Sequence, residues 1–232
     1  MLGRGLFIAA CLVMTNALSN PSLAAPFKIE EASIADVHRA MSNGQMTARQ
    51  LVQAYLKRIE AYDKKGPAIN AIIQINPKAL EEADRLDAAF QKKGLTGPLH
   101  GIPILVKDAI ATIDMPTTGG SLSLQGFVPK NEATIVRKLK EAGAIILGKT
   151  NLDEFTFGTR GISSLGGQTL NPYDLTRNPA GSSGGSGAAV SANFAMAALG
   201  TDTGSSIRFP SSSTSLVGLR ATVGLLSRSG IM

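Results

Sequence analysis

The chain has 232 residues, of which 44% are hydrophobic and 17% are charged. These values are typical of a globular protein, and the length is sufficient for one domain with a sizeable hydrophobic core. The net charge of +6 comes from 23 Lys and Arg residues that are interleaved with acids rather than clustered, which disfavours a nucleic-acid partner.

Residues 1–25 have the pattern of an export signal. Arg4 supplies a positive charge, the apolar run that follows is too short to span a bilayer, and small residues precede a cleavage site after Ala24 or Ala25. Cys11, the only cysteine, lies within this segment, so the mature chain is expected to have no disulfide and no thiol nucleophile. The sequence therefore predicts an exported protein, periplasmic or secreted, with no stable membrane anchor after cleavage.

The mature part of the sequence alternates between helical and strand-like patterns. Apolar periodicity, capping residues and β-branched runs define the expected elements. Helices are expected over 33–43, from the Thr47–Gln50 capping box to about Tyr62, over 76–91, over 131–142 and from about Gly185, and strands over 71–75, 102–106 and 144–147. This alternation favours an α/β fold with a mixed, mostly parallel β-sheet flanked by helices.

Three local details are also expected. In the second of these helices, one face is expected to carry roughly Leu51, Tyr55, Ile59 and Tyr62. Asp153 and Glu154 are typical of a helix start, where acids suit the helix dipole, and we assign them no catalytic role. Residues 211–213 are expected to form a turn and strand-edge material.

Two stretches match known motifs in letters but not in context. Gly143–Thr150 has P-loop spacing, but the residues between its glycines read as a buried strand and a helix precedes them. Gly181–Gly185 fits a nucleophile elbow, which needs a downstream histidine, whereas His38 and His100 both lie upstream. Two histidines and no mature cysteine also leave no transition-metal constellation, so no metal and no cofactor are expected. Nucleotide binding through Gly143–Thr150 is kept as the least favoured hypothesis.

Residues 180–210 contain two glycine-serine loops on either side of an apolar, alanine-rich segment that we expect to be a buried helix. Without histidine or cysteine, a serine in these loops needs another base, and a lysine can serve if burial keeps it neutral. Lys107 directly follows the strand 102–106, at the carboxyl end where open α/β sheets place ligands. A lysine at a strand end is also commonly solvated, so the residues alone leave both interpretations open.

Four blocks in order then resemble the amidase signature family: GIPILVKD, ILGKTNLDEFTFG, AGSSGGS, and TDTGSSIRFP followed by LVGLRAT. The resemblance covers roughly residues 30–232. The export signal and the second loop are more similar to secreted or general amidases than to the amidotransferase subunit that acts on transfer RNA. Family members continue for a region of comparable size, so the resemblance implies that 26–232 is the N-terminal portion of an amidase signature domain, incomplete at its C-terminus.

The resemblance also implies a catalytic triad. Ser206 matches the nucleophile, Ser182 matches a bridging serine that follows a cis peptide bond, and Lys107 matches the base. The implied reaction is hydrolysis of a carboxylic amide C–N bond through an acyl-enzyme on Ser206, with a small-molecule or peptide amide as substrate. An oxyanion hole would be formed by the backbone N–H groups of Thr203, Gly204, Ser205 and Ser206.

Three further residues are expected to support this site. Ser183 either assists the triad or caps the helix that follows it. Asp202 and Arg208 either bind substrate or form an ion pair that holds the loop, which we prefer. Many family members have glycine where this chain has Ser205, so a left-handed backbone there would cost about 1 kcal/mol. The alternative function is that of a non-catalytic fragment or binding remnant, and the oligomeric state is left open.

Overall fold

The computed structural model of the chain describes residues 27–232, so the expected export signal lies outside the described residues. The helices are α1 (Ile34–Ser42), α2 (Ala48–Tyr62), α3 (Ala79–Lys93), α4 (Thr134–Glu141), α5 (Gly184–Ser191) and α6 (Arg208–Ser213), with short 3-10 turns η1 (Leu122–Leu124) and η2 (Glu154–Thr156). The strands are β1 (Ile72–Ile75), β2 (Pro103–Lys107), β3 (Ile145–Thr150), β4 (Ile162–Ser163), β5 (Gly167–Gln168) and β6 (Ala197–Leu199). None of the helices in 27–232 is long and apolar enough to cross a membrane.

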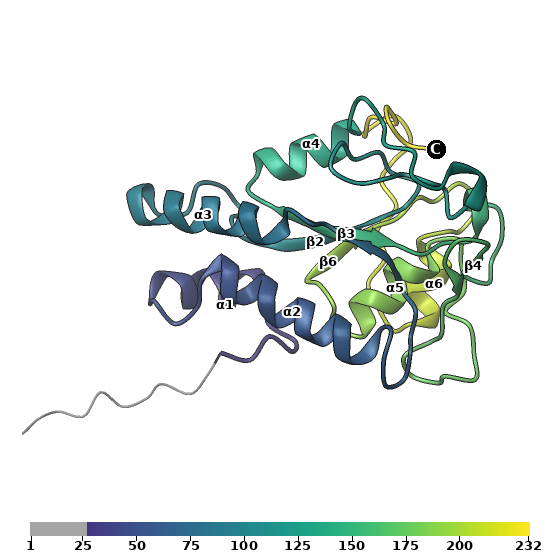
Figure 1. Ribbon diagram of the computed structural model, residues 1–232, viewed down its shortest axis with the longest axis horizontal. Coiled ribbons are helices and arrows are strands. Elements are labelled where there is room, and N and C mark those ends of the chain that lie inside the picture. Colours follow the sequence, from purple (N-terminus) through teal and green to yellow (C-terminus); the bar gives the residue numbers. More distant parts are fainter. Residues whose placement is uncertain (1–26) are drawn as a thin grey trace, which may run out of the picture.

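The central sheet has four strands in the order β1-β3-β2-β6 (Figure 1). Strand β2 pairs in parallel with both β3 and β6, whereas β1 runs antiparallel to β3. The predicted mixed, mostly parallel sheet is therefore confirmed. Because Lys107 lies opposite Thr150, the carboxyl ends of β2 and β3 lie at the same edge of the sheet.

Apolar cores cover both faces of the sheet. The larger core joins β2 and β3 to helices α2, α3 and α5, and the smaller one lies beneath α4. Figure 1 shows α4 on the opposite side of the sheet from α2 and α5. Both β2 and β3 are buried along their whole length, as parallel strands covered on two faces are.

Helix α2 has the predicted capping box, and most of its apolar residues are buried. The predicted capping box is present, since the Gln50 backbone N–H donates to Thr47 Oγ1 and the Gln50 side chain accepts from the Thr47 N–H. Leu51, Tyr55 and Ile59 are buried, whereas Tyr62 at the end of the helix is 43% exposed. The Arg58 guanidinium lies 5.0 Å from the Tyr62 ring centroid, so a cation covers this exposed ring.

One local expectation is met only in part, and another is wrong. The acids after Asn151 start only the single 3-10 turn η2, because the Asp153 carboxylate accepts the N–H groups of Arg160 and Gly161 instead of capping its own turn. Residues 211–213 lie in helix α6 rather than in a turn. The cause is again a remote carboxylate, since Asp202 accepts the backbone N–H groups at the start of that helix.

The apolar segment between the two serine loops is only partly the helix we expected. Helix α5 ends at Ser191, and Asn193 adopts a φ of 58° that turns the chain. The segment then forms β6, which pairs with β2. A helix followed by a strand thus brings both loops to the carboxyl edge of the sheet.

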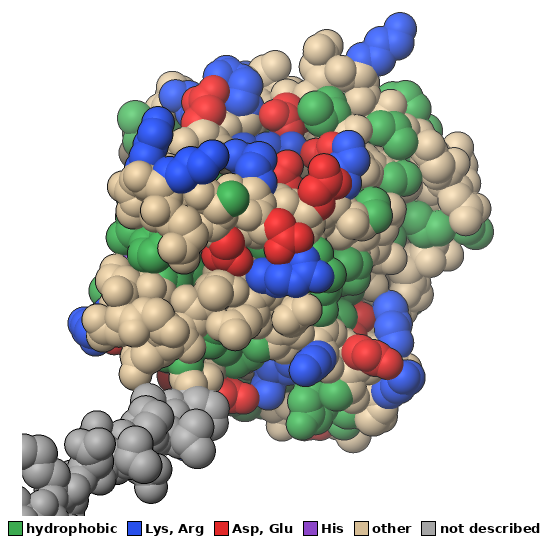
Figure 2. Space-filling model, turned by 60° about the vertical axis from the view of Figure 1, so that its left-hand side comes forward, with side chains coloured by type: hydrophobic (Ala, Val, Ile, Leu, Met, Phe, Trp, Pro, Cys, Tyr) green, Lys and Arg blue, Asp and Glu red, His purple; other side chains and the backbone are tan. Residues whose placement is uncertain are grey.

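Charged side chains of both signs are mixed on the surface. On the face in Figure 2, Lys and Arg side chains lie among Asp and Glu side chains. Exposed ion pairs on the surface of the protein include Arg85–Glu82 and Arg137–Glu141. Such pairs contribute little to stability, and the face in view presents no large surface of a single sign.

Candidate active site

Lys107 is the last residue of β2, and its side chain is completely buried. Its Nζ lies 2.7 Å from Ser182 Oγ and 2.8 Å from Thr201 Oγ1. Burial lowers the pKa of Lys107 to about 7, although the charges of Asp153 and Asp202 act in the opposite direction. The solvated strand-end interpretation is therefore wrong, and a substantial fraction of this amine is neutral near pH 7.

Ser182 lies at the turn that enters α5. The peptide bond between Gly181 and Ser182 is cis, as the resemblance implied. The Gly185 N–H donates to the Asn151 carbonyl at 3.0 Å, which fixes the first turn of α5 against the end of β3. The helix start and the two strand ends together hold the Ser182 hydroxyl against Lys107.

Ser206 lies in the second loop, which contacts the first through the backbone. The Ser183 N–H donates to the Ser206 carbonyl at 3.2 Å, so the two loops lie side by side. Within residues 27–232 the Ser206 hydroxyl forms no hydrogen bond, and the structure thus joins Lys107 to Ser182 but not Ser182 to Ser206. The structure brings the three residues of the predicted triad into one region with one of its two side-chain links made.

The loop before Ser206 carries the predicted oxyanion hole. In the part of the chain that the structure describes, these four backbone N–H groups donate to no other group: Thr203, Gly204, Ser205 and Ser206. They are therefore available to an incoming oxygen. Ser205 does not have a positive φ, so the serine at this position meets no left-handed backbone and the expected strain is absent.

Ser183 supports the site rather than the helix. It occupies the N-cap position of α5, but its side chain makes no capping hydrogen bond, so that alternative is wrong. Its hydroxyl instead accepts from the Thr201 N–H at 3.2 Å and donates to the Thr201 carbonyl at 3.3 Å. Ser183 therefore fixes the residue whose own hydroxyl contacts Lys107.

Asp202 and Arg208 form the expected ion pair, with 3.0 Å between Arg208 Nε and Asp202 Oδ2. Although burial opposes ionisation of Asp202, hydrogen bonds from Arg208 and from the Ile207 N–H hold the pKa of its carboxyl below the usual value. Arg220 adds a second cation, 3.9 Å from Oδ1. This arrangement closes the loop around Ser206 into a fixed turn.

Two residues at the site were not expected from the sequence. Thr201 provides the second hydroxyl for Lys107, and Asp153 is buried beside Ser182, whose carbonyl accepts the Asp153 N–H at 3.1 Å. Thr201 follows β6 by two residues, so its position depends on the register of that strand with β2. Asp153 could have been found only by knowing that the end of β3 lies under the first serine loop.

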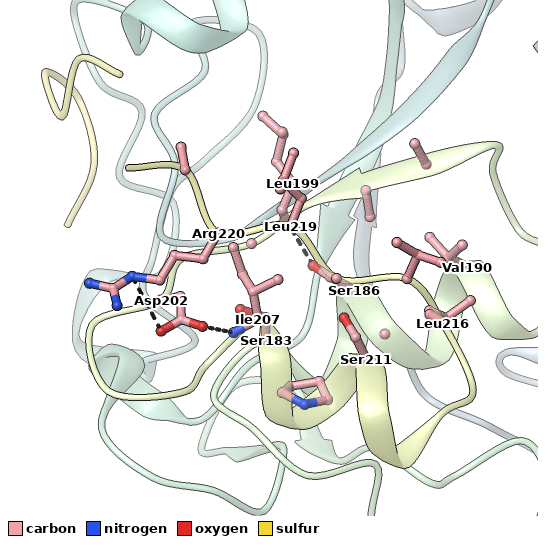
Figure 3. Close-up of a pocket in the computed structure, with 18 of the residues that line it drawn as sticks. Ser183, Ser186, Val190, Leu199, Asp202, Ile207, Ser211, Leu216, Leu219 and Arg220 are labelled. Atoms are coloured by element: carbon pink, nitrogen blue, oxygen red, sulfur yellow. Dashed lines mark hydrogen bonds and ion pairs between the residues drawn. The ribbon is translucent and has the colours of Figure 1, made fainter. Parts of the chain in front are cut away.

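A cavity of about 540 Å³ lies behind the second loop (Figure 3). Ser183, Asp202 and Arg220 form its polar end, and its walls are mainly apolar. Neither Lys107 nor Ser206 lines it, so this cavity adjoins the site without containing the reacting groups.

The P-loop-like stretch does not have the structure that nucleotide binding needs. Its last six residues form the buried strand β3. The Lys149 amine donates to the Ile110 carbonyl at 2.6 Å and to Thr117 Oγ1 at 2.9 Å, so it is not free for a phosphate. Among the described residues, no three His, Cys, Asp or Glu side chains are grouped as a metal site requires.

The family profile described as amidase matches residues 50–232. The peptide amidase of Stenotrophomonas maltophilia is 48% identical with a TM-score of 0.86, over 89% of this chain and 43% of its own. An amidase family protein from Bacillus anthracis is 38% identical with a TM-score of 0.84, over 88% of this chain and 42% of its own.

A glutamyl-tRNA(Gln) amidotransferase subunit from Maridesulfovibrio salexigens is 46% identical over 87% of this chain and 41% of its own length. Sequence identity does not separate the amidotransferase subunits from the peptide amidases, so the preference for general amidases stays a prediction. The chain spans less than half the length of these relatives. The profile match and these likenesses, which cover most of the chain, show that it belongs to the amidase signature family of hydrolases.

Proposed function

We propose that this chain carries the acyl-transfer machinery of an amidase. The observation that supports this most directly is the buried Lys107 amine, with a pKa lowered to about 7 and Nζ 2.7 Å from the Ser182 hydroxyl. A base poised near neutral pH is what general-base catalysis requires. The Ser206 loop beside it supplies a hydroxyl without a competing hydrogen bond in the described part of the chain.

In the proposed reaction, neutral Lys107 takes the proton of Ser182 as Ser182 takes the proton of Ser206. The Ser206 oxygen attacks the amide carbonyl, and the oxyanion is bound by the N–H groups of the 203–206 loop. The proton then returns through Ser182 to the leaving nitrogen, the C–N bond breaks, and an acyl ester remains on Ser206. Water attacks this ester by the same relay and releases the acid.

The similarity to a peptide amidase makes a peptide amide the first substrate to test. We also propose that the protein acts after export, which rests on the pattern of residues 1–25. Substrates are thus expected to be small-molecule or peptide amides. Apart from the substrate and water, the proposed reaction uses side chains and backbone groups of the chain.

The test separates reactivity of the serine from turnover of a substrate. A fluorophosphonate probe is expected to label the recombinant protein, with mass spectrometry locating the adduct on Ser206. Ser206→Ala should remove the label and lower ammonia release from a peptide amide by on the order of 10⁴–10⁶-fold. Ser227→Ala, which alters an exposed serine, should keep both.

An adduct on another serine, or hydrolysis that survives Ser206→Ala, would contradict the proposal. A folded protein with no label on Ser206 would favour the alternative, a non-catalytic binding remnant. Labelling of Ser206 without hydrolysis of any amide would support Ser206 as the nucleophile and contradict only the proposed substrate class.

A further inference from the structure

Asp153 is a buried acid that the proposed reaction does not use. Its side chain is 3% exposed, and its carboxylate accepts the Arg160 N–H at 3.0 Å and the Gly161 N–H at 2.8 Å. Its own backbone N–H donates to the Ser182 carbonyl. A carboxylate held this firmly next to the bridging serine has a fixed position relative to the proton relay.

The Asp153 carboxylate also packs against the backbone of the first serine loop. A Cβ on Gly181 would lie 1.8 Å from Asp153 Oδ2, so only a glycine allows this approach. The same carboxylate faces Gly158, where a Cβ would lie 2.5 Å from Oδ1. Asp153 therefore sits between the loop that carries Ser182 and the turn that follows η2.

Asp153 differs from Asp202, the other acid that acts on Lys107, in having no cationic partner among the described residues. Two acids act on the Lys107 amine, Asp153 from the end of β3 and Asp202 from the loop before α6. Asp202 is engaged by Arg208 and lies near Arg220, whereas Asp153 forms no ion pair within residues 27–232. Both carboxylates act on the buried amine, and the charge of Asp153 is the one that no cation of the described residues pairs with.

We propose that Asp153 is a positioning residue for the relay: its carboxylate seats the Gly181–Ser182 segment and supplies the negative charge that stabilises the Lys107 ammonium once the proton has arrived. This inference rests on the proposed function, because it gives Asp153 a part in that reaction. Coulomb interaction is strong in a poorly polarisable interior, so one buried carboxylate has a measurable effect on the amine.

The test compares Asp153→Asn with Glu154→Gln, which removes a charge one residue further on at a more exposed site. Lys107 is titrated directly by NMR of its labelled side chain in both variants and in the wild type. Asp153→Asn should move the Lys107 pKa below its value of about 7, because the charge that favours the ammonium is gone. Glu154→Gln should leave it in place. An unchanged or higher Lys107 pKa in folded Asp153→Asn would overturn the inference.

Activity provides a second readout. The rate of fluorophosphonate labelling at Ser206 should rise with pH through about 7 in the wild type, and this rise should shift to lower pH in Asp153→Asn. With an amide substrate at a pH where the amine is neutral in both proteins, kcat should fall because the base is weaker, while KM changes little, since the carboxylate acts on the base and not on the substrate. If the wild type shows no labelling, the proposed function fails while the Lys107 titration still decides the role of Asp153.

A measurement on the wild type covers the case in which Asp153→Asn does not fold. The labelled carboxyl carbon of Asp153 should show an inflection near pH 7 as the neighbouring amine gains its proton. The absence of any inflection between pH 6 and pH 8 would overturn the inference without a variant.

Discussion

Gly185 illustrates, at the scale of one residue, why the site tolerates so few side chains. A Cβ there would lie 2.4 Å from the Asn151 carbonyl oxygen, 2.5 Å from the Asn151 nitrogen and 2.6 Å from the Ala71 carbonyl oxygen. All three obstacles are backbone atoms at the end of β3 and the start of β1, which cannot rotate away. The glycine therefore sets how closely α5, and with it Ser182, approaches Lys107.

Gly185→Ala should destabilise the protein even though alanine favours a helix by about 1 kcal/mol over glycine. Forcing a methyl group into a filled space costs about 1–3 kcal/mol, and contacts with rigid backbone belong at the upper end of that range. Thermal unfolding should show a lower Tm for Gly185→Ala. Gly204→Ala provides the control, because a Cβ at that position meets nothing within 4 Å. Equal Tm values for the two variants would contradict this steric explanation.

At the scale of elements, two buried lysines lie near the carboxyl ends of neighbouring strands but contact different groups. Lys107 contacts Ser182 and Thr201, whereas Lys149 on β3 contacts Ile110 and Thr117, with Asp108 Oδ1 3.4 Å from its amine. Burial lowers the pKa of Lys149 to about 8, with Asp108 acting in the opposite direction. One lysine belongs to the site and the other joins β3 to the segment after β2.

The sequence predicted strands over 102–106 and 144–147, which stop short of both lysines, and it offered Lys107 as a candidate base without deciding whether its amine is buried. Continuous apolar runs such as 102–106 lack the alternation that assigns side chains to faces. The family resemblance favoured Lys107 as the base over a solvated lysine. The contacts of the Ser183 hydroxyl with Thr201 depend on the pairing of β6 with β2, which the sequence did not predict. The helices near Asp153 and Asp202 also differ from the prediction, because each carboxylate accepts N–H groups several residues away. Such contacts are not visible in the local sequence pattern.

The two lysines predict how stability depends on pH. Each has a folded pKa below the ordinary 10.5, so between pH 8 and pH 10 the unfolded chain binds protons that the folded chain does not. The free energy of unfolding should therefore rise with pH in this interval, by at most about 1.4 kcal/mol per pH unit for each lysine. Above pH 10 the buried Tyr55, whose pKa is raised to about 12 mainly by burial, acts in the opposite direction.

Urea unfolding at pH 8 and pH 10 measures this rise. Lys149→Met should reduce the slope because one of the two titrating amines is gone, whereas Lys138→Gln, at an exposed position on α4, should leave it unchanged. A wild-type free energy of unfolding that stays flat or falls from pH 8 to pH 10 would show that the two amines are not neutral, buried groups.

At the scale of the whole molecule, exposed apolar side chains gather near one edge of the sheet. Strand β6 is the last strand of the order β1-β3-β2-β6, and in the described residues no strand pairs with its outer edge. Val217, Leu219 and Leu226 line the cavity next to β6. Val217 is 99% exposed, and Val223 in the same segment is 84% exposed. Contiguous apolar surface beside an open strand edge favours association between copies of a chain.

The protein should therefore self-associate in a concentration-dependent way, and charges placed in this segment should weaken that association. Burying apolar area contributes about 25 cal/mol per Å², so replacing two nearly fully exposed valines with lysines removes area that contact would bury and adds mutual repulsion. Sedimentation velocity over a range of concentrations should show a larger monomer fraction for Val217→Lys/Val223→Lys than for the wild type. Ile113→Lys, at an apolar residue 47% exposed elsewhere on the surface, should sediment like the wild type. If Ile113→Lys raises the monomer fraction as much as the double variant does, association is not confined to the edge next to β6.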